Sequence, residues 1–338
     1  MLGRGGIFES DLDEIIGLTK SECSNLKNQE ITILGGSGFV GTWLISFLCT
    51  ANEQLDLNLH IITPTRNLEA AKNKLKLREK DPVSIVEFDF SSVRKTFNTQ
   101  SKFYFLGLTP TVKSTGTLEG ELILRSTQNA ITFVKECASK SGVCPTVIHL
   151  SSGAVYQDLN SEVLIEKNVE TLTSKDAYTQ AKIMLEKSLL GMHNMNLIKA
   201  SNPRLFAFMG PHLKLDEHFA IGNFMNDCLK GKEIVVKGNP LTTRSYLYPT
   251  DLVTWLMKIL IKPSTLPLNF GSDKSLTMQD IAGSLSIFFD KRDIEYRNPD
   301  SPISHYVPSI ENTKKHLGVT QKISFSEGLE RWKKWLTN

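Results

Sequence analysis

From Glu30 onward, short and largely apolar runs alternate along the chain with longer segments of helical length. Each run is bounded by polar or turn-forming residues, which is typical of buried strands. The runs are Ile31–Leu34, Leu59–Ile62, Ile85–Phe88, Phe103–Leu106 and Val147–Leu150. The helical segments are Val40–Cys49, Leu118–Ala138 and Ala177–Leu190. Strands that alternate with helices predict an α/β fold built on a doubly wound parallel sheet.

After Pro203 the order of elements changes, and the pattern predicts a helix, two short strands and two further helices. These elements are Phe219–Lys230, Ile234–Lys237, Ser245–Tyr248, Leu252–Ile261 and Met278–Phe289. We therefore predict a first domain over residues 29–202. A smaller α/β domain takes most of 203–338, with segments that return to the first sheet. Residues 1–28 are expected to form an N-terminal extension, in which only Asp11–Leu18 looks amphipathic.

Composition narrows the range of partners. The chain has 39 Lys and Arg against 36 Asp and Glu, a net charge of +3, and its basic residues are scattered, so we expect no nucleic-acid partner and no membrane partner. No apolar run approaches the ~20 residues of a membrane span, and Met1–Glu9 lacks the layout of a secretion signal. The five cysteines form no close-spaced pairs. An odd number of cysteines fits reduced thiols, so we expect a cytoplasmic protein without a disulfide framework or a metal site.

The first predicted strand is joined to the first predicted helix by a glycine-rich loop, Gly35-Gly36-Ser37-Gly38-Phe39-Val40-Gly41. Such a loop uses Gly35 for a tight turn, Gly38 for close approach to a pyrophosphate, and Gly41 for close packing of the helix on the strand. The N–H groups at the start of the helix would then bind the phosphates. The loop predicts a dinucleotide site that also includes Ser37, Phe39 and Val40. A tight turn without a cofactor is the alternative.

The choice of cofactor depends on the end of the second predicted strand. NAD-binding proteins usually place an acidic residue there, but this chain has Arg66 near that position. A guanidinium group matches the geometry of a 2′-phosphate, so we favour NADP, with NAD as the alternative. The alternative is that Arg66 is a solvated arginine in a loop without a role in binding. Asp89, at the end of the third strand, is expected near the adenine ring or as a helix N-cap.

A second set of chemical residues follows the fifth predicted strand. Ser152 lies just after this strand, and Tyr178 and Lys182 lie four residues apart in a predicted helix, so the last two share one helical face. A nearby ammonium group favours a phenolate, so we expect Lys182 to lower the pKa of Tyr178 and allow it to exchange a proton with a substrate oxygen. Ser152 would donate a hydrogen bond to that oxygen. The nicotinamide would carry the hydride.

Taken together, these residues resemble the extended short-chain dehydrogenase/reductase family of nucleotide-sugar epimerases, dehydratases and reductases, of the NAD-dependent epimerase/dehydratase type. The resemblance extends from about Glu30 to Trp335. Further matching stretches are Arg204 to Pro211, Arg244 to Tyr248 with Asp251, Asn269 to Ser272, and Lys314 to Leu317. The resemblance implies a Rossmann-type domain followed by a smaller sugar-nucleotide domain. It also implies a homodimer formed through Leu118–Ala138 and Ala177–Leu190.

The family resemblance also implies roles for individual residues. Leu106 and Gly107 would lie near the nicotinamide, together with Tyr178 and Lys182. Arg244 would bind the diphosphate of a nucleotide-sugar substrate, although a salt bridge at the rim is its alternative role. The other residues expected at the substrate are Thr109, Ser152, Gly153, His218 and Asn223.

Several positions depart from the family pattern. Dehydratases carry an acidic pair, or at least a glutamate, where this chain has Gly153 and Ala154, so 4,6-dehydration lacks its usual acid and base. Ile123 and Ala207 stand where the family has asparagines, and the usual residues after the fourth strand are replaced by Leu106–Thr109. Placement of the substrate is therefore expected to be unusual.

We interpret the chain as an NAD(P)-dependent enzyme that acts on a nucleotide-diphosphate sugar. We expect hydride transfer at a carbon of the sugar, which we take to be C4. A 4-keto sugar reductase is slightly favoured, because reduction by exchangeable NADPH fits Arg66. A 4-epimerase or dehydratase with retained NAD is the alternative. A non-catalytic cofactor-binding protein is the rival from another class, although Ser152, Tyr178 and Lys182 are all present.

Overall fold

The computed structural model describes residues 1–92, 97, 99–108, 117–140, 142, 144–157, 161–168, 176–215, 219–290 and 292–338. The chain divides into two units. Unit 1 consists of Met1–Val155, Lys167–Arg204 and Thr250–Leu268, and unit 2 of Tyr156–Glu166, Leu205–Pro249 and Asn269–Asn338. The chain crosses into unit 2 at Tyr156–Glu166, inside the predicted first domain of 29–202, and again after Arg204, and it returns to unit 1 for Thr250–Leu268.

Unit 1 is built on a six-stranded parallel sheet in the order β3-β2-β1-β4-β5-β7. These strands are β1 (Glu30–Leu34), β2 (His60–Thr65), β3 (Val83–Glu87), β4 (Phe103–Leu106), β5 (Thr146–His149) and β7 (Lys199–Ser201). The order of strands reverses beside β1, as in Rossmann-type sheets, so the predicted fold class is confirmed. Two short strands, β6 (Ser151–Ser152) and β8 (Pro203–Leu205), follow β5 and β7.

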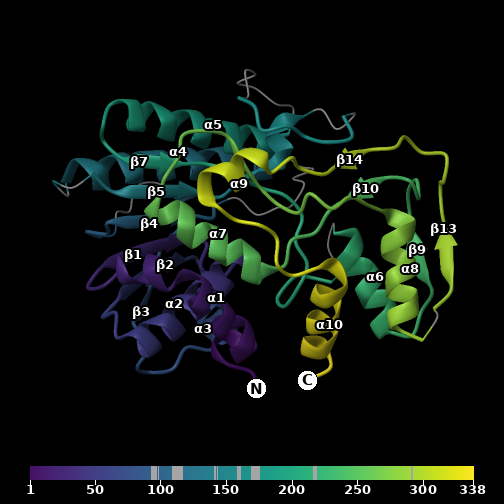
Figure 1. The fold of residues 1–338 in the computed structure, drawn as a ribbon. Coiled ribbons are helices and arrows are strands. Elements are labelled where there is room, and N and C mark those ends of the chain that lie inside the picture. The colour runs from purple at the N-terminus through teal and green to yellow at the C-terminus, as the bar shows by residue number, and fades with distance from the viewer. Residues whose placement is uncertain are drawn as a thin grey trace. The chain divides into compact units, whose positions relative to one another are not determined.

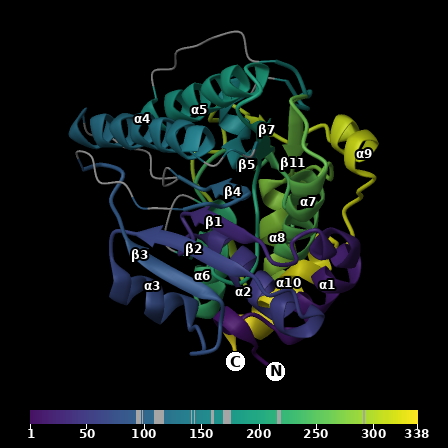
Figure 2. The same ribbon diagram turned by 90° about the vertical axis from the view of Figure 1, so that its left-hand side faces the viewer.

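Helices cover both faces of this sheet (Figures 1 and 2). They are α1 (Glu9–Ser24), α2 (Phe39–Leu55), α3 (Leu68–Leu75), α4 (Thr117–Lys140), α5 (Ala177–Asn194) and α7 (Pro249–Ile261), with two 3-10 turns, η1 (Arg4–Gly6) and η2 (Gly153–Tyr156). Helices α4 and α5 pack side by side over one face, and α2 packs with α1 and α3 over the other. A core that includes Tyr104, Leu106, Phe133 and Leu185 lies under α4 and α5.

The structure differs from the sequence prediction at the N-terminus. Residues 1–28 form η1 and α1, which pack against α2 as part of unit 1 instead of forming an appendage. Leu12 and Ile15 are fully buried, so the amphipathic stretch recognised at Asp11–Leu18 is a core-facing helix. The buried Arg4 guanidinium fastens η1 through ion pairs with Glu53 and Asp81, each 2.7 Å long.

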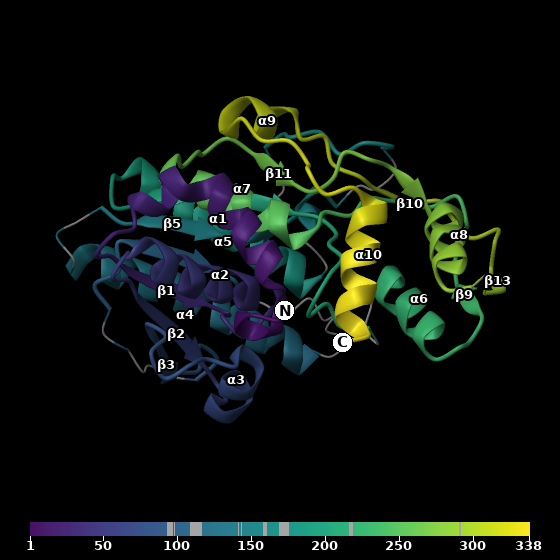
Figure 3. The ribbon, with the colours of Figure 1, turned by 60° about the horizontal axis from the view of Figure 1, so that its bottom comes forward.

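The described residues of unit 2 form small sheets and several helices (Figure 3). Its strands are β9 (Ile234–Val236), β10 (Thr243–Arg244), β11 (Leu268–Phe270, which begins in unit 1), β12 (Leu276–Thr277), β13 (Ile294–Tyr296) and β14 (His305–Tyr306). Its helices are α6 (Ala220–Leu229), α8 (Met278–Phe288), α9 (Glu311–Leu317) and α10 (Phe325–Leu336). Strands β9 and β13 pair in parallel, α6 and α8 pack together, and β10 pairs with β12 and β14.

The prediction of a strand at Ser245–Tyr248 is wrong. The strand in this region is β10, at Thr243–Arg244, and beyond it only Leu247 makes an isolated bridge, to Phe208. All four predicted residues are buried, so the apolar pattern reflected core packing and not strand pairing. Across the described ranges, no helix is long and apolar enough to cross a membrane.

We expect Leu12→Ala to lower the free energy of unfolding by about 2–5 kcal/mol, because it leaves a cavity in the interface of α1 with α2. Urea unfolding followed by circular dichroism measures the change. Gly17→Ala is the matched control, because Gly17 is exposed on the same helix and an added Cβ would meet no atom within 4 Å. An equal, small effect of both changes would show that α1 is not part of the cooperative unit.

Candidate active site

The glycine-rich loop lies between β1 and α2 at the carboxyl edge of the unit 1 sheet. Gly35 has φ of +81°, and a Cβ there would lie 2.3 Å from the carbonyl oxygen of Gly107, just after β4. A Cβ on Gly36 would lie 2.1 Å from Oγ1 of Thr63 in β2. The loop is therefore pressed against the ends of its two neighbouring strands, and side chains at these positions would push it away.

The start of α2 is shaped to accept an anion. Its N-cap residue is the exposed Gly38, which has no side chain that could cap the helix. A Cβ on Gly41 would lie 2.3 Å from the carbonyl oxygen of Gly35, so only glycine permits this approach of helix and turn. Ser37, Phe39 and Val40 are partly exposed around the same turn. The helix start has no capping side chain and carries the positive end of the helix dipole, which fits the pyrophosphate of a dinucleotide.

Arg66 and Asp89 follow strands β2 and β3 at the same edge of the sheet. Arg66 is exposed and forms no ion pair with any residue that the structure describes. Asn67 caps the next helix, α3, by accepting a hydrogen bond from Ala70 N at 2.9 Å. The Asp89 carboxylate instead accepts hydrogen bonds from the backbone N–H and the hydroxyl of Ser91, each at 2.8 Å. Asp89 thus holds a turn, which neither of its two predicted roles anticipated.

Helix α5 carries Tyr178 and Lys182 on successive turns. Its N-cap is Asp176, whose carboxylate accepts a hydrogen bond from Thr179 N at 2.8 Å. The Lys182 ammonium is buried and donates to the carbonyl oxygens of Leu108 at 3.0 Å and Leu150 at 2.7 Å. The predicted shared face is confirmed, because Lys182 Nζ lies 5.5 Å from the centre of the Tyr178 ring.

Unit 1 brings the predicted catalytic and cofactor residues to one edge of its sheet. Lys182 binds the carbonyl of Leu108, its neighbour Gly107 contacts Gly35, and Gly107 N donates to Leu34 O at 2.9 Å. Leu106, the last residue of β4, is fully buried beneath this contact. Ser152 lies in β6, just after β5. Leu150, which accepts the other hydrogen bond of Lys182, lies between these two strands.

The expectation that Lys182 lowers the pKa of Tyr178 is wrong for this structure. Burial raises the pKa of the Tyr178 phenol, and a hydrogen bond from Ser152 acts in the opposite direction. Burial also lowers the pKa of Lys182 to about 7, with Glu186 opposing this shift. The physical reason is that the lysine directs its protons at two carbonyl oxygens, while both groups lose the solvation of their charged forms.

Gly153 begins the turn η2 and is buried beside Ser152, and Ala154 N donates to Ser152 Oγ at 3.2 Å. Neither residue brings an ionisable group to Ser152. Thr109 and His218, both predicted at the substrate, lie outside the described residues.

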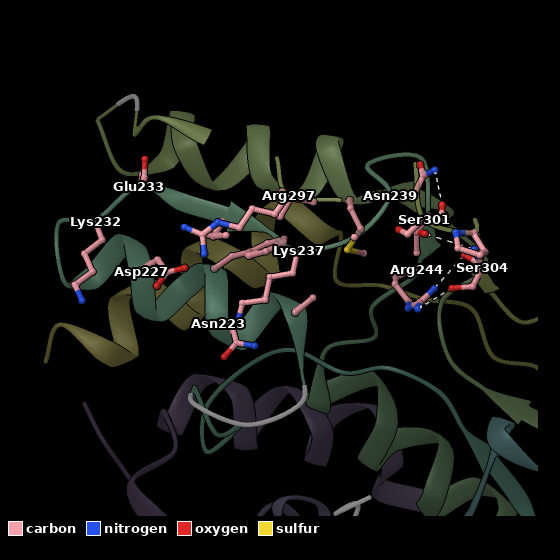
Figure 4. Close-up of a pocket in the computed structure, with 18 residues that line it drawn as sticks. Asn223, Asp227, Lys232, Glu233, Lys237, Asn239, Arg244, Arg297, Ser301 and Ser304 are labelled. Carbon is pink, nitrogen blue, oxygen red and sulfur yellow. Dashed lines mark hydrogen bonds between the residues drawn. The ribbon is translucent and has the colours of Figure 1, made fainter. Parts of the chain in front are cut away.

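Unit 2 contains a cavity of about 940 Å³ that is lined by both Asn223 and Arg244 (Figure 4). Asn223 extends from α6. Arg244, on β10, donates to the carbonyl oxygens of Thr243 at 2.7 Å and Ser304 at 3.1 Å. Burial lowers the pKa of Arg244, and among the described residues no carboxylate pairs with it. A partly buried cation held by neutral groups is suited to an anionic ligand, and the predicted rim salt bridge is absent from this part of the chain.

Some residues near these sites were not recognised from the sequence. Lys232, Lys237 and Arg297 also line the cavity of unit 2, and no motif marked them. In unit 1, Glu186 forms a buried ion pair with Arg204. A signal for Glu186 exists, because it lies four residues after Lys182 on the same helical face. Where the chain is described, no cluster of three His, Cys, Asp or Glu residues could hold a metal ion.

Comparison with known proteins identifies the family. The sequence model of the NAD dependent epimerase/dehydratase family matches residues 31–269, which is more than half of the chain. The chain belongs to this family. The predicted resemblance is thereby confirmed, and the protein belongs to a family of enzymes whose members include nucleotide-sugar decarboxylases, epimerases and dehydratases.

Three relatives illustrate the similarity. UDP-glucuronic acid decarboxylase 6 of Arabidopsis thaliana is 24% identical over 319 residues, covering 89% of this chain and 87% of the relative. The structure of an epimerase from Methanothermobacter thermautotrophicus superposes with a TM-score of 0.77 at 19% identity, covering 95% and 96% of the two chains. The UDP-glucuronic acid 4-epimerase of Bacillus cereus, in complex with UDP-glucuronic acid and NAD, has a TM-score of 0.72 at 18% identity, covering 91% and 99%.

We expect Gly41→Ala to weaken binding of NAD(P)H by at least about tenfold, because the new methyl group would push the helix start away from the Gly35 turn. Quenching or enhancement of reduced-cofactor fluorescence measures the dissociation constant. Gly283→Ala is the matched control, because Gly283 lies in helix α8 and an added Cβ there meets no atom within 4 Å. Wild-type affinity in a folded Gly41→Ala protein would contradict the assignment of this loop to a cofactor.

Proposed function

We propose that this member of the NAD dependent epimerase/dehydratase family transfers hydride between a nicotinamide dinucleotide and C4 of a nucleotide-diphosphate sugar, with Tyr178 as the general acid or base. The observation that carries the proposal is the assembly of Ser152, Tyr178 and Lys182 at the sheet edge that also holds the glycine loop. A fold alone does not imply a function, but this combination supplies a cofactor cradle and a proton-transfer group in one place.

The roles of the residues follow from their contacts. The nicotinamide, when bound, supplies or accepts the hydride at the sugar carbon. During reduction of a keto group, the Tyr178 phenol donates its proton to the sugar oxygen, and during oxidation of the alcohol it takes that proton back. Ser152 already hydrogen-bonds the phenol and is placed to donate to the same sugar oxygen. Lys182 donates to two carbonyl groups beyond β4 and β5, and this fixes the face of α5 that carries Tyr178 at the sheet edge.

We favour reduction of a 4-keto sugar over dehydration. Elimination of water across C5 and C6 needs a further acid and base, and Gly153 and Ala154 supply neither. A 4-epimerase with retained NAD is the second candidate, and it is supported by structural neighbours that include 4-epimerases. Both reactions use the same proton transfer by Tyr178. They differ in whether the cofactor leaves the protein during the cycle.

Arg244 and Asn223 support a nucleotide-diphosphate substrate. The cavity in unit 2 is lined by an arginine that pairs with no carboxylate among the described residues, and a diphosphate would supply it with two negative charges. Neighbouring structures contain UDP-glucose, UDP-glucuronic acid and UDP-N-acetylmuramic acid as bound molecules. We extend this class of ligand to the present chain without choosing the nucleotide.

We propose NADP as the preferred cofactor, although neighbouring structures contain NAD. The exposed Arg66 follows β2 directly and forms no ion pair in the described part of the chain, so its guanidinium group is available to a 2′-phosphate. A homodimer formed through α4 and α5 and a cytoplasmic location stay predictions of the sequence.

The reaction is tested by incubating the protein with 4-keto-6-deoxy and C4-hydroxy sugar nucleotides, with and without NADPH, followed by product NMR. We expect 4-keto sugars to be reduced when NADPH is added. Conversion of C4-hydroxy sugars without added cofactor would favour the epimerase instead. Tyr178→Phe should lower kcat by about 10²–10⁴-fold while cofactor binding is retained, because only the proton donor is lost.

The matched control for Tyr178→Phe is Tyr104→Phe, which removes a buried phenol hydroxyl from β4 in the core of unit 1. It should leave kcat near the wild-type value. If the wild-type protein binds cofactor and none of the sugars turns over, the non-catalytic binding protein replaces the enzyme as the better explanation.

We expect Arg66→Ala to raise the dissociation constant of NADPH by about tenfold to a hundredfold, because a charged hydrogen bond to a phosphate is worth about 1.5–3 kcal/mol. The dissociation constant of NADH should change much less. Fluorescence titration with both cofactors measures the ratio. Arg78→Ala is the control, because Arg78 is an exposed arginine beyond the far end of α3. An equal loss for both cofactors would remove the argument from Arg66.

A further inference from the structure

A buried polar cluster lies next to the catalytic residues of unit 1, formed by Glu186, Arg204 and Ser151. The Glu186 carboxylate receives hydrogen bonds from Arg204 Nε at 3.0 Å and from the terminal Arg204 nitrogen at 2.8 Å. It also accepts a hydrogen bond from Ser151 Oγ at 2.5 Å. All three residues are buried, and Arg204 donates further to the Lys167 carbonyl at 2.6 Å.

The cluster connects the elements that carry the catalytic trio. Tyr178, Lys182 and Glu186 occupy successive turns of α5, so the glutamate extends the catalytic face of the helix by one turn. Ser151 precedes Ser152 in strand β6. The hydrogen bond between Ser151 and Glu186 therefore fastens the helix that carries the tyrosine and lysine to the strand that carries the serine.

Stability alone does not explain such a cluster. Removing an ion pair from water costs several kcal/mol per ion, and well-packed apolar side chains of similar volume stabilise a protein as well or better. The pair lies one helical turn from the buried Lys182, and this position suggests a more specific role. Its hydrogen bonds fix α5 relative to β6, and the carboxylate charge acts on Lys182.

Among the groups around Lys182, Glu186 supplies the negative charge. Burial lowers the pKa of Lys182 to about 7, and Glu186 opposes this shift. His149, on β5, is buried and its pKa is well below its usual value, so it is neutral at neutral pH. Arg204 lies beyond the glutamate. The buried residues of the neighbouring helix α4 are uncharged: Ile123, Thr127, Ala130, Phe133, Val134 and Cys137.

We propose that Glu186 is a positioning residue, which holds α5 against β6 through Ser151 and places a negative charge one helical turn from Lys182, with Arg204 holding the glutamate in place. This inference rests on the proposed function, because the trio that it positions is the proposed catalytic trio. Its effect on Lys182 is nevertheless a property of the protein without any substrate, and this separates the two tests.

The first measurement follows the protonation of Lys182 in the full chain by NMR of protein labelled at lysine Cε, with the signal assigned from Lys182→Arg. We expect the wild-type lysine to titrate near pH 7. In Glu186→Gln the titration should move to lower pH by about one unit, because an opposite charge beside the ammonium is lost. Asp81→Asn is the matched control, because it breaks a buried ion pair with Arg4 elsewhere in unit 1 and should leave the titration unchanged.

The second measurement uses Ser151→Ala, which keeps both charges and removes one hydrogen bond, so that it tests the proposal even if Glu186→Gln fails to fold. With a sugar nucleotide that the wild-type protein converts, kcat should fall by about tenfold with little change in KM, because the catalytic groups lose their relative placement. Wild-type kcat in Ser151→Ala, or an unchanged Lys182 titration in Glu186→Gln, would overturn the proposal. Failure of every sugar nucleotide would count against the proposed function, while the titration would still decide the role of Glu186.

Discussion

The placement of the Lys182 ammonium between two backbone carbonyl groups is the interaction on which the arrangement of unit 1 depends. Its acceptors, Leu108 and Leu150, lie just beyond the ends of β4 and β5, so one side chain ties α5 to two neighbouring strands. Gly107 beside Leu108 is in turn pressed against Gly35. A single chain of contacts thus runs from the helix with Tyr178 to the loop shaped for a dinucleotide.

The fold was largely predictable from the sequence because its signals are local. The apolar runs around Ile31, Phe103 and Val147 are buried on both faces, and such runs mark parallel strands. The glycine spacing is equally local, since a tight turn restricts both backbone conformation and side-chain volume. The small strands of unit 2 were harder to predict. Buried residues such as Tyr246 and Leu247 pack in the core without forming a ladder, and apolar pattern alone does not separate these cases.

Electrostatic features required the three-dimensional structure. The spacing of Tyr178 and Lys182 predicted their shared face, but not the carbonyl groups that receive the protons of the lysine or the burial that changes both pKa values. Glu186 and Arg204 belong to different elements, α5 and β8, and no local motif predicts that they form an ion pair. Desolvation depends on every surrounding atom, and for that reason the motifs predicted candidate catalytic residues but not what controls their charge.

Arg244 has a consequence for how ligands of this protein can be found. Arg244 is a partly buried cation whose hydrogen bonds, among the described residues, go to neutral oxygen atoms, so a counter-ion would stabilise the folded state. An anionic molecule that binds there stabilises the folded state in proportion to the logarithm of its concentration over its dissociation constant. If the proposed nucleotide ligand binds at Arg244, the melting temperature of the protein ranks nucleotides by their fit without a catalytic assay.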